Sequence, residues 1–231
     1  MRNEFVLVHG AAHGAWCWDE VAERLEAKGH RVITLDLPGH GRRASEVRQA
    51  SVATYAHAVA DAMAREGISR GIVVGHSMGG LVICKAAELV PARIAHLVFL
   101  AAVVLPHGGS LAGVHLTAAG RGDGAFLYPA EIAWARWMND LPREHPSVAR
   151  ALARLTPQAA RPFLEPVDLR AFYSMHVPRT YIRCLLDAAV TPRKAVEYAA
   201  RLGVTPIDMD CAHDAMLSAP DELARILGRI Q

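Results

Sequence analysis

The chain has 231 residues, of which 52% are hydrophobic, and its 25 basic residues nearly balance its 23 acidic ones. This length favours one large domain with a buried sheet over two small domains. The balanced charge, without a basic run, argues against a nucleic-acid partner, and no apolar run reaches the roughly 18 uncharged residues that a membrane span needs.

Strand-like and helix-like segments alternate along most of the chain. Short apolar, β-branched runs indicate buried strands, and segments of helical spacing that stop at glycine or proline indicate helices. The expected strands are 5–9, 31–36, 71–74, 94–102, 179–186 and 205–209, and the expected helices are 18–28, 52–66, 78–90, 192–202 and 219–230. This alternation predicts a mostly parallel α/β sheet of about six strands with helices on both faces.

The segment 105–178, which we call the cap segment, interrupts the alternation. It has no clear strand, and it is too long for a plain loop in a compact domain. Seven aromatic residues lie in it: Phe126, Tyr128, Trp134, Trp137, Phe163, Phe172 and Tyr173. We expect a mostly helical insertion over the carboxyl ends of the strands, where open α/β sheets bind ligands, with 1–104 and 179–231 forming the core domain. The alternative is a packed subdomain without a ligand role.

Residues 75–79 form the pattern Gly-His-Ser-Met-Gly between the expected strand 71–74 and the expected helix 78–90. This order of strand, turn and helix is that of a nucleophile elbow, which lifts the hydroxyl of Ser77 out of the sheet. Glycines at 75 and 79 leave room for a strained backbone at the serine. The alternative is a strand-to-helix turn in which Ser77 is only a cap.

A serine on such an elbow needs a base to remove its proton, and the acid and the histidine follow it in the chain. His213 follows the last expected strand, at the same sheet edge as Ser77. By contrast, His76 is expected to point the wrong way, and His9 precedes the serine. The sequence therefore predicts His213 as the base; the alternative is a histidine in a surface loop.

Asp187 is the predicted partner of the base, because it ends the strand one strand–helix unit before His213. Asp208 and Asp210 are too close in sequence to reach behind the ring of His213, and Asp214 is expected to face away from it. Two backbone N–H groups would bind the oxyanion. They belong to Met78, after the serine, and to Ala11, in the small-residue loop after the first strand.

Five stretches resemble one known family: residues 5–18 (F-V-L-V-H-G-A-A-H-G-A-W-C-W), 75–80, 156–166, 181–184 and 212–217. They are similar to the methylesterase and hydroxynitrile lyase family of α/β-hydrolases. The similarity runs from the first expected strand to the last expected helix. It implies the α/β-hydrolase fold with a helical cap insertion, and a triad of Ser77, Asp187 and His213.

The resemblance also separates two chemistries. The lyases carry a threonine after the opening histidine and a lysine after the catalytic one, whereas this chain has Gly10 and Asp214 there. A lysine would stabilise departing cyanide, and an aspartate would repel it. The family comparison thus favours the esterases, although these commonly have an apolar residue at the position of Asp214.

The expected function is that of a serine hydrolase that cleaves a small, largely apolar carboxylic ester or lactone through an acyl-enzyme. The substrate would meet Gly10 in the loop after the first strand and four aromatic residues of the cap segment, Phe126, Tyr128, Trp134 and Trp137. The alternative for these four is packing inside the cap.

Two other functions stay open: a lyase or polyketide-type cyclase that uses the triad as acid and base, and a ligand receptor on a hydrolase fold. We expect no metal and no cofactor, because zinc-ligand spacings are absent and no G-x-G-x-x-G follows the first strand. The four cysteines form no C-x-x-C pair and no signal-peptide pattern opens the chain, which favours reduced thiols and a cytoplasmic location. The edge of a cap can pair two copies into a homodimer.

Overall fold

The computed structural model describes residues 2–112 and 124–230. Six strands form one sheet in the order β2-β1-β3-β4-β7-β8, and every neighbouring pair is parallel. The strands are β1 (Glu4–Val8), β2 (Arg31–Leu35), β3 (Gly71–His76), β4 (Ile94–Leu100), β7 (Arg179–Cys184) and β8 (Ile207–Met209). The predicted fold class is therefore confirmed.

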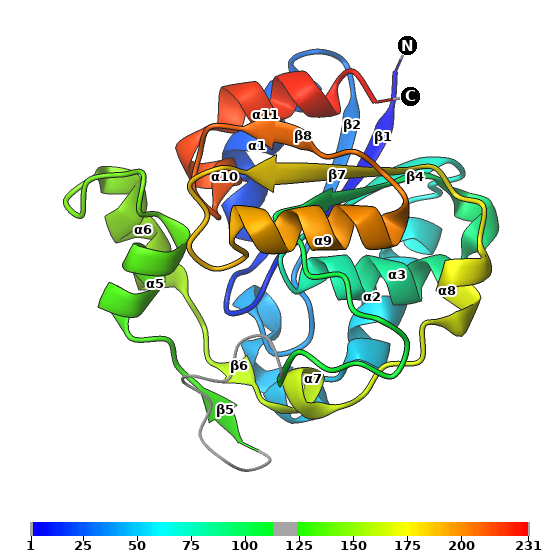
Figure 1. Cartoon of the computed structure of the whole chain (residues 1–231), viewed down its shortest axis with the longest axis horizontal. Coiled ribbons are helices and arrows are strands. Elements are labelled where there is room, and N and C mark those ends of the chain that lie inside the picture. Colours follow the sequence, from blue (N-terminus) through cyan, green and yellow to red (C-terminus); the bar gives the residue numbers. More distant parts are fainter. Residues whose placement is uncertain (1, 113–123, 231) are drawn as a thin grey trace.

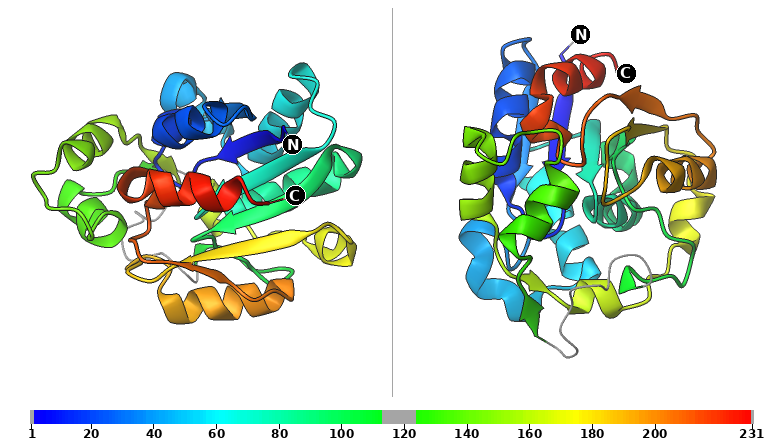
Figure 2. Two further views of the ribbon diagram at one scale, coloured as in Figure 1. Left: turned by 90° about the horizontal axis from the view of Figure 1, so that it is seen from above. Right: turned by 60° about the vertical axis from the view of Figure 1, so that its left-hand side comes forward.

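Helices cover both faces of this sheet (Figures 1 and 2). Side chains alternate along β1, so that Val6 and Val8 pack in one hydrophobic cluster while Phe5 and Leu7 pack in another. The first cluster includes α2 (Val52–Arg65), α3 (Gly79–Leu89) and α9 (Pro192–Leu202), and the second includes α1 (Asp19–Glu26), α10 (Ala215–Ser218) and α11 (Pro220–Leu227). Each fully buried aliphatic or aromatic side chain stabilises the fold by about 1.5–3 kcal/mol.

Most element boundaries lie within a few residues of the expected ones. The expected helix 219–230 begins at Pro220 but ends earlier, at Leu227, and Gly228 follows as the residue that ends α11. Three 3₁₀ segments add short connections that the sequence patterns did not predict: η1 (Ala15–Trp18), η2 (Gly41–Gln49) and η3 (Pro91–Arg93).

Helices are the main regular structure of the cap segment where it is described, but they make up less than half of those residues, so the expected mostly helical insertion is wrong in extent. Its elements are β5 (Ala125–Phe126), α5 (Ala130–Trp137), α6 (Pro146–Arg154), β6 (Gln158–Ala159), α7 (Arg161–Leu164) and α8 (Arg170–Ser174). The expectation of no strand is wrong in one detail, since β5 and β6 form a short antiparallel ladder. Two residues per strand are too few to give an alternating pattern, and their pairing depends on chain segments more than 30 residues apart.

The helices α5 and α6 lie side by side, beyond the carboxyl ends of β7 and β8 (Figure 1). They share a small cluster that contains Ala133, Trp137, Val148 and, from the loop after β1, Ala12. Phe163 and Phe172 of the same cap segment instead pack in the first hydrophobic cluster, which contains Val6 and Val8 of β1. The division of the chain into a core and an inserted cap stays a prediction.

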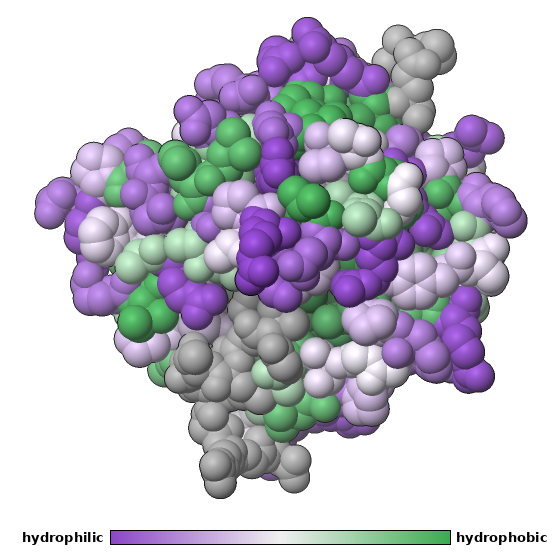
Figure 3. Space-filling model, in the orientation of Figure 1, coloured by the Kyte–Doolittle hydropathy of each residue, from purple (hydrophilic) through white to green (hydrophobic). Residues whose placement is uncertain are grey.

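The surface gives two further facts. On the face shown in Figure 3, apolar patches are interrupted by hydrophilic side chains. Among the helices of the described residues, none combines the length and the apolar character needed to cross a bilayer.

Candidate active site

The elbow between β3 and α3 holds Ser77 in a strained conformation. Its φ is +53°, a value that non-glycine residues rarely adopt, and its N–H donates a hydrogen bond to the carbonyl oxygen of Leu100 at 3.1 Å. A Cβ atom at Gly75 would lie 2.5 Å from the carbonyl oxygen of Gly79, and one at Gly79 would lie 2.8 Å from that of Val8. Both glycines are therefore needed for the turn to close.

His213 lies in the loop between β8 and α10, and its Nδ1 is 2.7 Å from Oδ2 of Asp187. Both side chains are buried. The other oxygen of Asp187, Oδ1, accepts hydrogen bonds from the N–H groups of Ala189 at 2.7 Å and Val190 at 2.8 Å. These two donors fix the carboxylate, which in turn accepts a hydrogen bond from the Nδ1–H of His213 and leaves its Nε2 as the proton acceptor.

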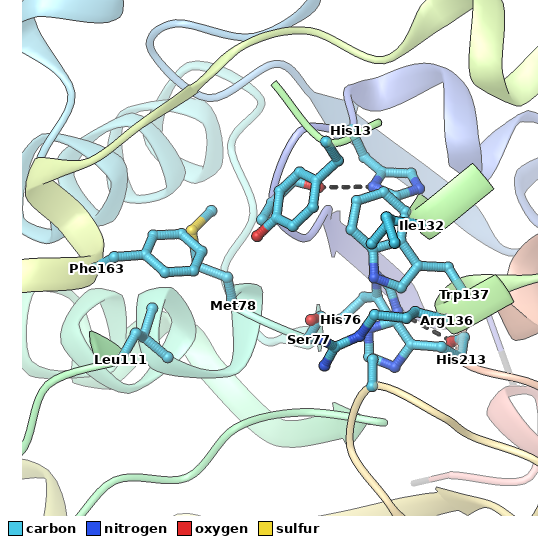
Figure 4. Close-up of a pocket in the computed structure, with 13 residues that line it drawn as sticks. His13, His76, Ser77, Met78, Leu111, Ile132, Arg136, Trp137, Phe163 and His213 are labelled. Atoms are coloured by element: carbon cyan, nitrogen blue, oxygen red, sulfur yellow. Dashed lines mark hydrogen bonds between the residues drawn. The ribbon is translucent and has the colours of Figure 1, made fainter. Parts of the chain in front are cut away.

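One pocket brings Ser77 and His213 together (Figure 4). It encloses about 570 Å³ of empty space, part of which is open to solvent. Ala11 and Met78 also line it, and neither N–H donates a hydrogen bond to another described residue. Two unpaired donors beside a serine are what an oxyanion site requires, and their role stays a prediction.

The predicted substrate contacts divide into two groups. Tyr128 and Trp137 line the pocket, whereas Phe126, Trp134 and Gly10 are not among its lining residues. The indole N–H of Trp134 donates to the carbonyl oxygen of Leu141, and the ring of Phe126 packs against those of Tyr128 and Phe163. Gly10 serves the close approach of two loops, because a Cβ there would lie 2.9 Å from Cβ of Ser77.

Several lining residues were not predicted from the sequence. His13 comes from the loop after β1, Ile132 and Arg136 come from α5, and Phe163 comes from α7. The spacing of four between Ile132 and Arg136 is the one signal that places two of them on a common helix face. Which face of α5 meets the pocket depends on its packing against α6.

Asp214 forms a second buried contact beside the base. We expected it to face away from His213; its Oδ2 lies 3.0 Å from Nε2 of His13, and both side chains are buried. Burial opposes a charge on His13, but the carboxylate of Asp214 outweighs it and raises the pKa of His13. The contact with Asp214 connects the loop after β1 to the loop that carries His213. Within the first loop, Nδ1 of His13 lies 2.8 Å from the carbonyl oxygen of Ala11.

His76, expected to point the wrong way, contributes to the same buried cluster. One potential ligand atom from each of His76, His213 and Asp214 lies within 4.8 Å of the others. The Nε2–H of His76 donates to the carbonyl oxygen of His213 at 3.1 Å, so a hydrogen bond accounts for part of this arrangement. The expectation that the protein has no metal stays a prediction.

The buried histidines predict a loss of stability in acid. Burial lowers the pKa of His9, His40 and His76 below the ordinary value of about 6.5. Below that pH the unfolded chain binds protons at these residues that the folded chain does not bind, so the free energy of unfolding falls by up to about 4 kcal/mol per pH unit. The effect of His13 on stability has the opposite sign. Its contribution to the free energy of unfolding is complete below about pH 6.5 and is lost as the pH rises through its raised folded pKa.

Urea unfolding at pH 7, 6 and 5 would measure this slope. The variant His40→Gln removes one of the three groups and is expected to flatten the slope by about a third. Stability that stays constant or rises between pH 7 and pH 5 would contradict the prediction.

The parallel sheet, the serine elbow and the contact between Asp187 and His213 define a class of proteins. Comparison with known proteins identifies this class. The chain belongs to the alpha/beta hydrolase family, whose model matches residues 5–226. It is 32% identical to a carbendazim hydrolyzing esterase of Nocardioides sp. (strain SG-4G), over 98% of each protein. It is 33% identical to a putative chloroplastic methylesterase of Arabidopsis thaliana over 81% of this chain, which corresponds to 53% of that protein.

Solved structures agree with this assignment. An extracellular alpha/beta-hydrolase from a Paenibacillus species has a TM-score of 0.87 at 25% identity, over 97% of both chains. A pyrethroid hydrolase from Sphingobium faniae JZ-2 has a TM-score of 0.81 at 26% identity, over 99% of this chain and 96% of that one. The resemblance to esterases and methylesterases that the sequence motifs indicated is confirmed.

Proposed function

We propose that this protein is a serine esterase that hydrolyses small carboxylic esters or lactones through an acyl-enzyme. The observation that carries the proposal is the 2.7 Å contact between His213 and Asp187, on a pocket that Ser77 also lines. The relatives that are named as esterases support the same chemistry. Aromatic residues on the pocket wall, Tyr128, Trp137 and Phe163, suit a substrate with a largely apolar part.

The mechanism follows from the order of these contacts. Nε2 of His213 removes the proton of the Ser77 hydroxyl as Oγ attacks the carbonyl carbon, and Asp187 stabilises the imidazolium that forms. The N–H groups of Ala11 and Met78 bind the oxyanion, where one such donor contributes about 3–4 kcal/mol. His213 then gives its proton to the leaving alcohol. The same nitrogen next activates water, which releases the acid and frees Ser77.

The other candidate functions are less favoured. A lyase or cyclase would use the triad without an acyl-enzyme, and a receptor would bind without turnover, but the similar proteins are esterases and hydrolases by name. A cytoplasmic location and a homodimer stay predictions.

The proposal is tested by trapping the acyl-enzyme. The protein is mixed with p-nitrophenyl acetate or butyrate, quenched in acid and digested, and the peptide that contains Ser77 is analysed by mass spectrometry. We expect a mass increase of one acyl group on Ser77, with continuous release of p-nitrophenol. A folded protein that releases no p-nitrophenol and carries no adduct would contradict the esterase proposal.

A further inference from the structure

The helix α5 places one arginine in the pocket that holds Ser77 and His213. Arg136 is half-buried and lines this pocket together with Ile132 and Trp137 of the same helix. Figure 4 shows its side chain extending across the pocket toward Ser77 and His213. A permanent positive charge therefore stands where the substrate must bind.

Arg136 differs from the other described arginines of the cap segment, because it has no partner among the described residues. Five other arginines in the described part of that segment each form an ion pair with a carboxylate: Arg143, Arg150, Arg154, Arg161 and Arg170. Arg136 forms no ion pair and no hydrogen bond with residues 2–112 or 124–230. Among residues 2–112 and 124–230, no aspartate or glutamate lines the pocket.

The polar neighbours in the pocket do not neutralise this charge. Burial raises the pKa of Tyr128 to about 12, although the charge of Arg136 opposes that rise, so the phenol is uncharged at neutral pH. His13 cannot offset the charge of Arg136, because an imidazole is either neutral or positively charged, and the carboxylate of Asp214 already pairs with His13. Within the described residues the pocket thus has a positive charge without a counter-charge, which an anionic ligand would supply.

We propose that Arg136 binds a carboxylate of the substrate, so that the preferred substrates are esters whose acyl part carries a second, ionised carboxyl group. This inference rests on the esterase activity proposed above. A guanidinium group offers paired N–H donors that match the two oxygens of a carboxylate. Ile132, Trp137 and Phe163 would contact the carbon chain between that carboxylate and the ester.

A second role for Arg136 predicts a different result. An arginine that stabilised the oxyanion would act on the reacting carbonyl of every ester, and its loss would lower kcat for neutral and charged substrates alike. An arginine that binds a distant carboxylate acts only on substrates that have one, and its loss raises KM for these alone.

Matched methyl esters separate the two roles. Monomethyl succinate, glutarate and adipate are compared at pH 7.5 with methyl butanoate, pentanoate and hexanoate, in which a methyl group replaces the carboxylate; methanol release is measured. We expect at least one acidic ester to exceed its neutral match about 10- to 100-fold in kcat/KM, the usual range for a charged hydrogen bond. Arg136→Met is expected to abolish this preference through KM, and Arg136→Lys to retain part of it.

The control is Arg143→Met, which removes a half-buried arginine that is paired with Glu131 and does not line the pocket, and it is expected to leave both series unchanged. Thermal melting checks that each variant is folded. Neutral esters that react as well as all three acidic ones would overturn this inference and leave the esterase intact, as would an equal loss in both series for Arg136→Met. Failure of all six esters together with p-nitrophenyl butyrate would instead overturn the proposed function.

Discussion

Replacing Ser77 with alanine is expected to lower kcat for p-nitrophenyl butyrate by about 10⁵- to 10⁶-fold. Without Oγ no acyl-enzyme forms, and only the oxyanion donors and the pocket can still assist water. Alanine has the same steric limits as serine at φ +53°, so the elbow is expected to remain folded. Steady-state rates beside matched melting curves would measure the effect.

The same experiment tests whether Ser77 and His213 act as one unit. The double variant Ser77→Ala with His213→Ala is expected to be no slower than Ser77→Ala alone, because the histidine has no proton to remove once Oγ is absent. Ser218→Ala is the control serine: it lies on α10, a few residues after His213, and does not line the pocket. A Ser77→Ala protein that kept a tenth of its activity would disprove the acyl-enzyme mechanism.

Replacing Asp187 with asparagine is expected to lower kcat by about 10⁴-fold. The reason lies in the two backbone N–H groups, of Ala189 and Val190, that both donate to Oδ1. They hold the amide oxygen of an asparagine at that position, which turns its NH₂ group toward Nδ1 of His213. Nδ1 must then accept a hydrogen bond rather than donate one, so Nε2 carries the ring hydrogen and no longer acts as the base.

Asp208→Asn is the matched control, because Asp208 pairs with Arg183 on the surface strands and not with His213. We expect its kcat to stay within about twofold of the wild type, as is usual for exposed ion pairs. If Asp187→Asn retained most of its activity, another carboxylate would have to orient His213. Asp214 would then be the first residue to test.

The fold and the contact between Asp187 and His213 could be predicted from local patterns and from the rules of parallel sheets. Periodic apolar runs identify the six strands, and the glycines at 75 and 79 identify the elbow, since any Cβ at either position meets backbone atoms. A parallel sheet then brings the carboxyl ends of its strands to one edge, so the loops that carry Asp187 and His213 had to approach the elbow.

The walls of the pocket could not be predicted in this way, because composition does not determine which face of a helix turns inward. Trp134 and Trp137 are three residues apart on α5, yet only Trp137 lines the pocket, while Trp134 bonds to the chain after the helix. The contact between His13 and Asp214 could not be predicted either, because the two residues are 201 positions apart and no sequence pattern pairs them.

By itself, then, the sequence determined the α/β alternation and the glycine-flanked serine turn, because each is set by neighbours in the chain. Only the tertiary structure decided that His13 pairs with Asp214 and that Arg136 faces the pocket, where no described carboxylate offsets its charge. These contacts join segments that are remote in sequence, and their geometry depends on how α5 and α6 pack over the sheet edge.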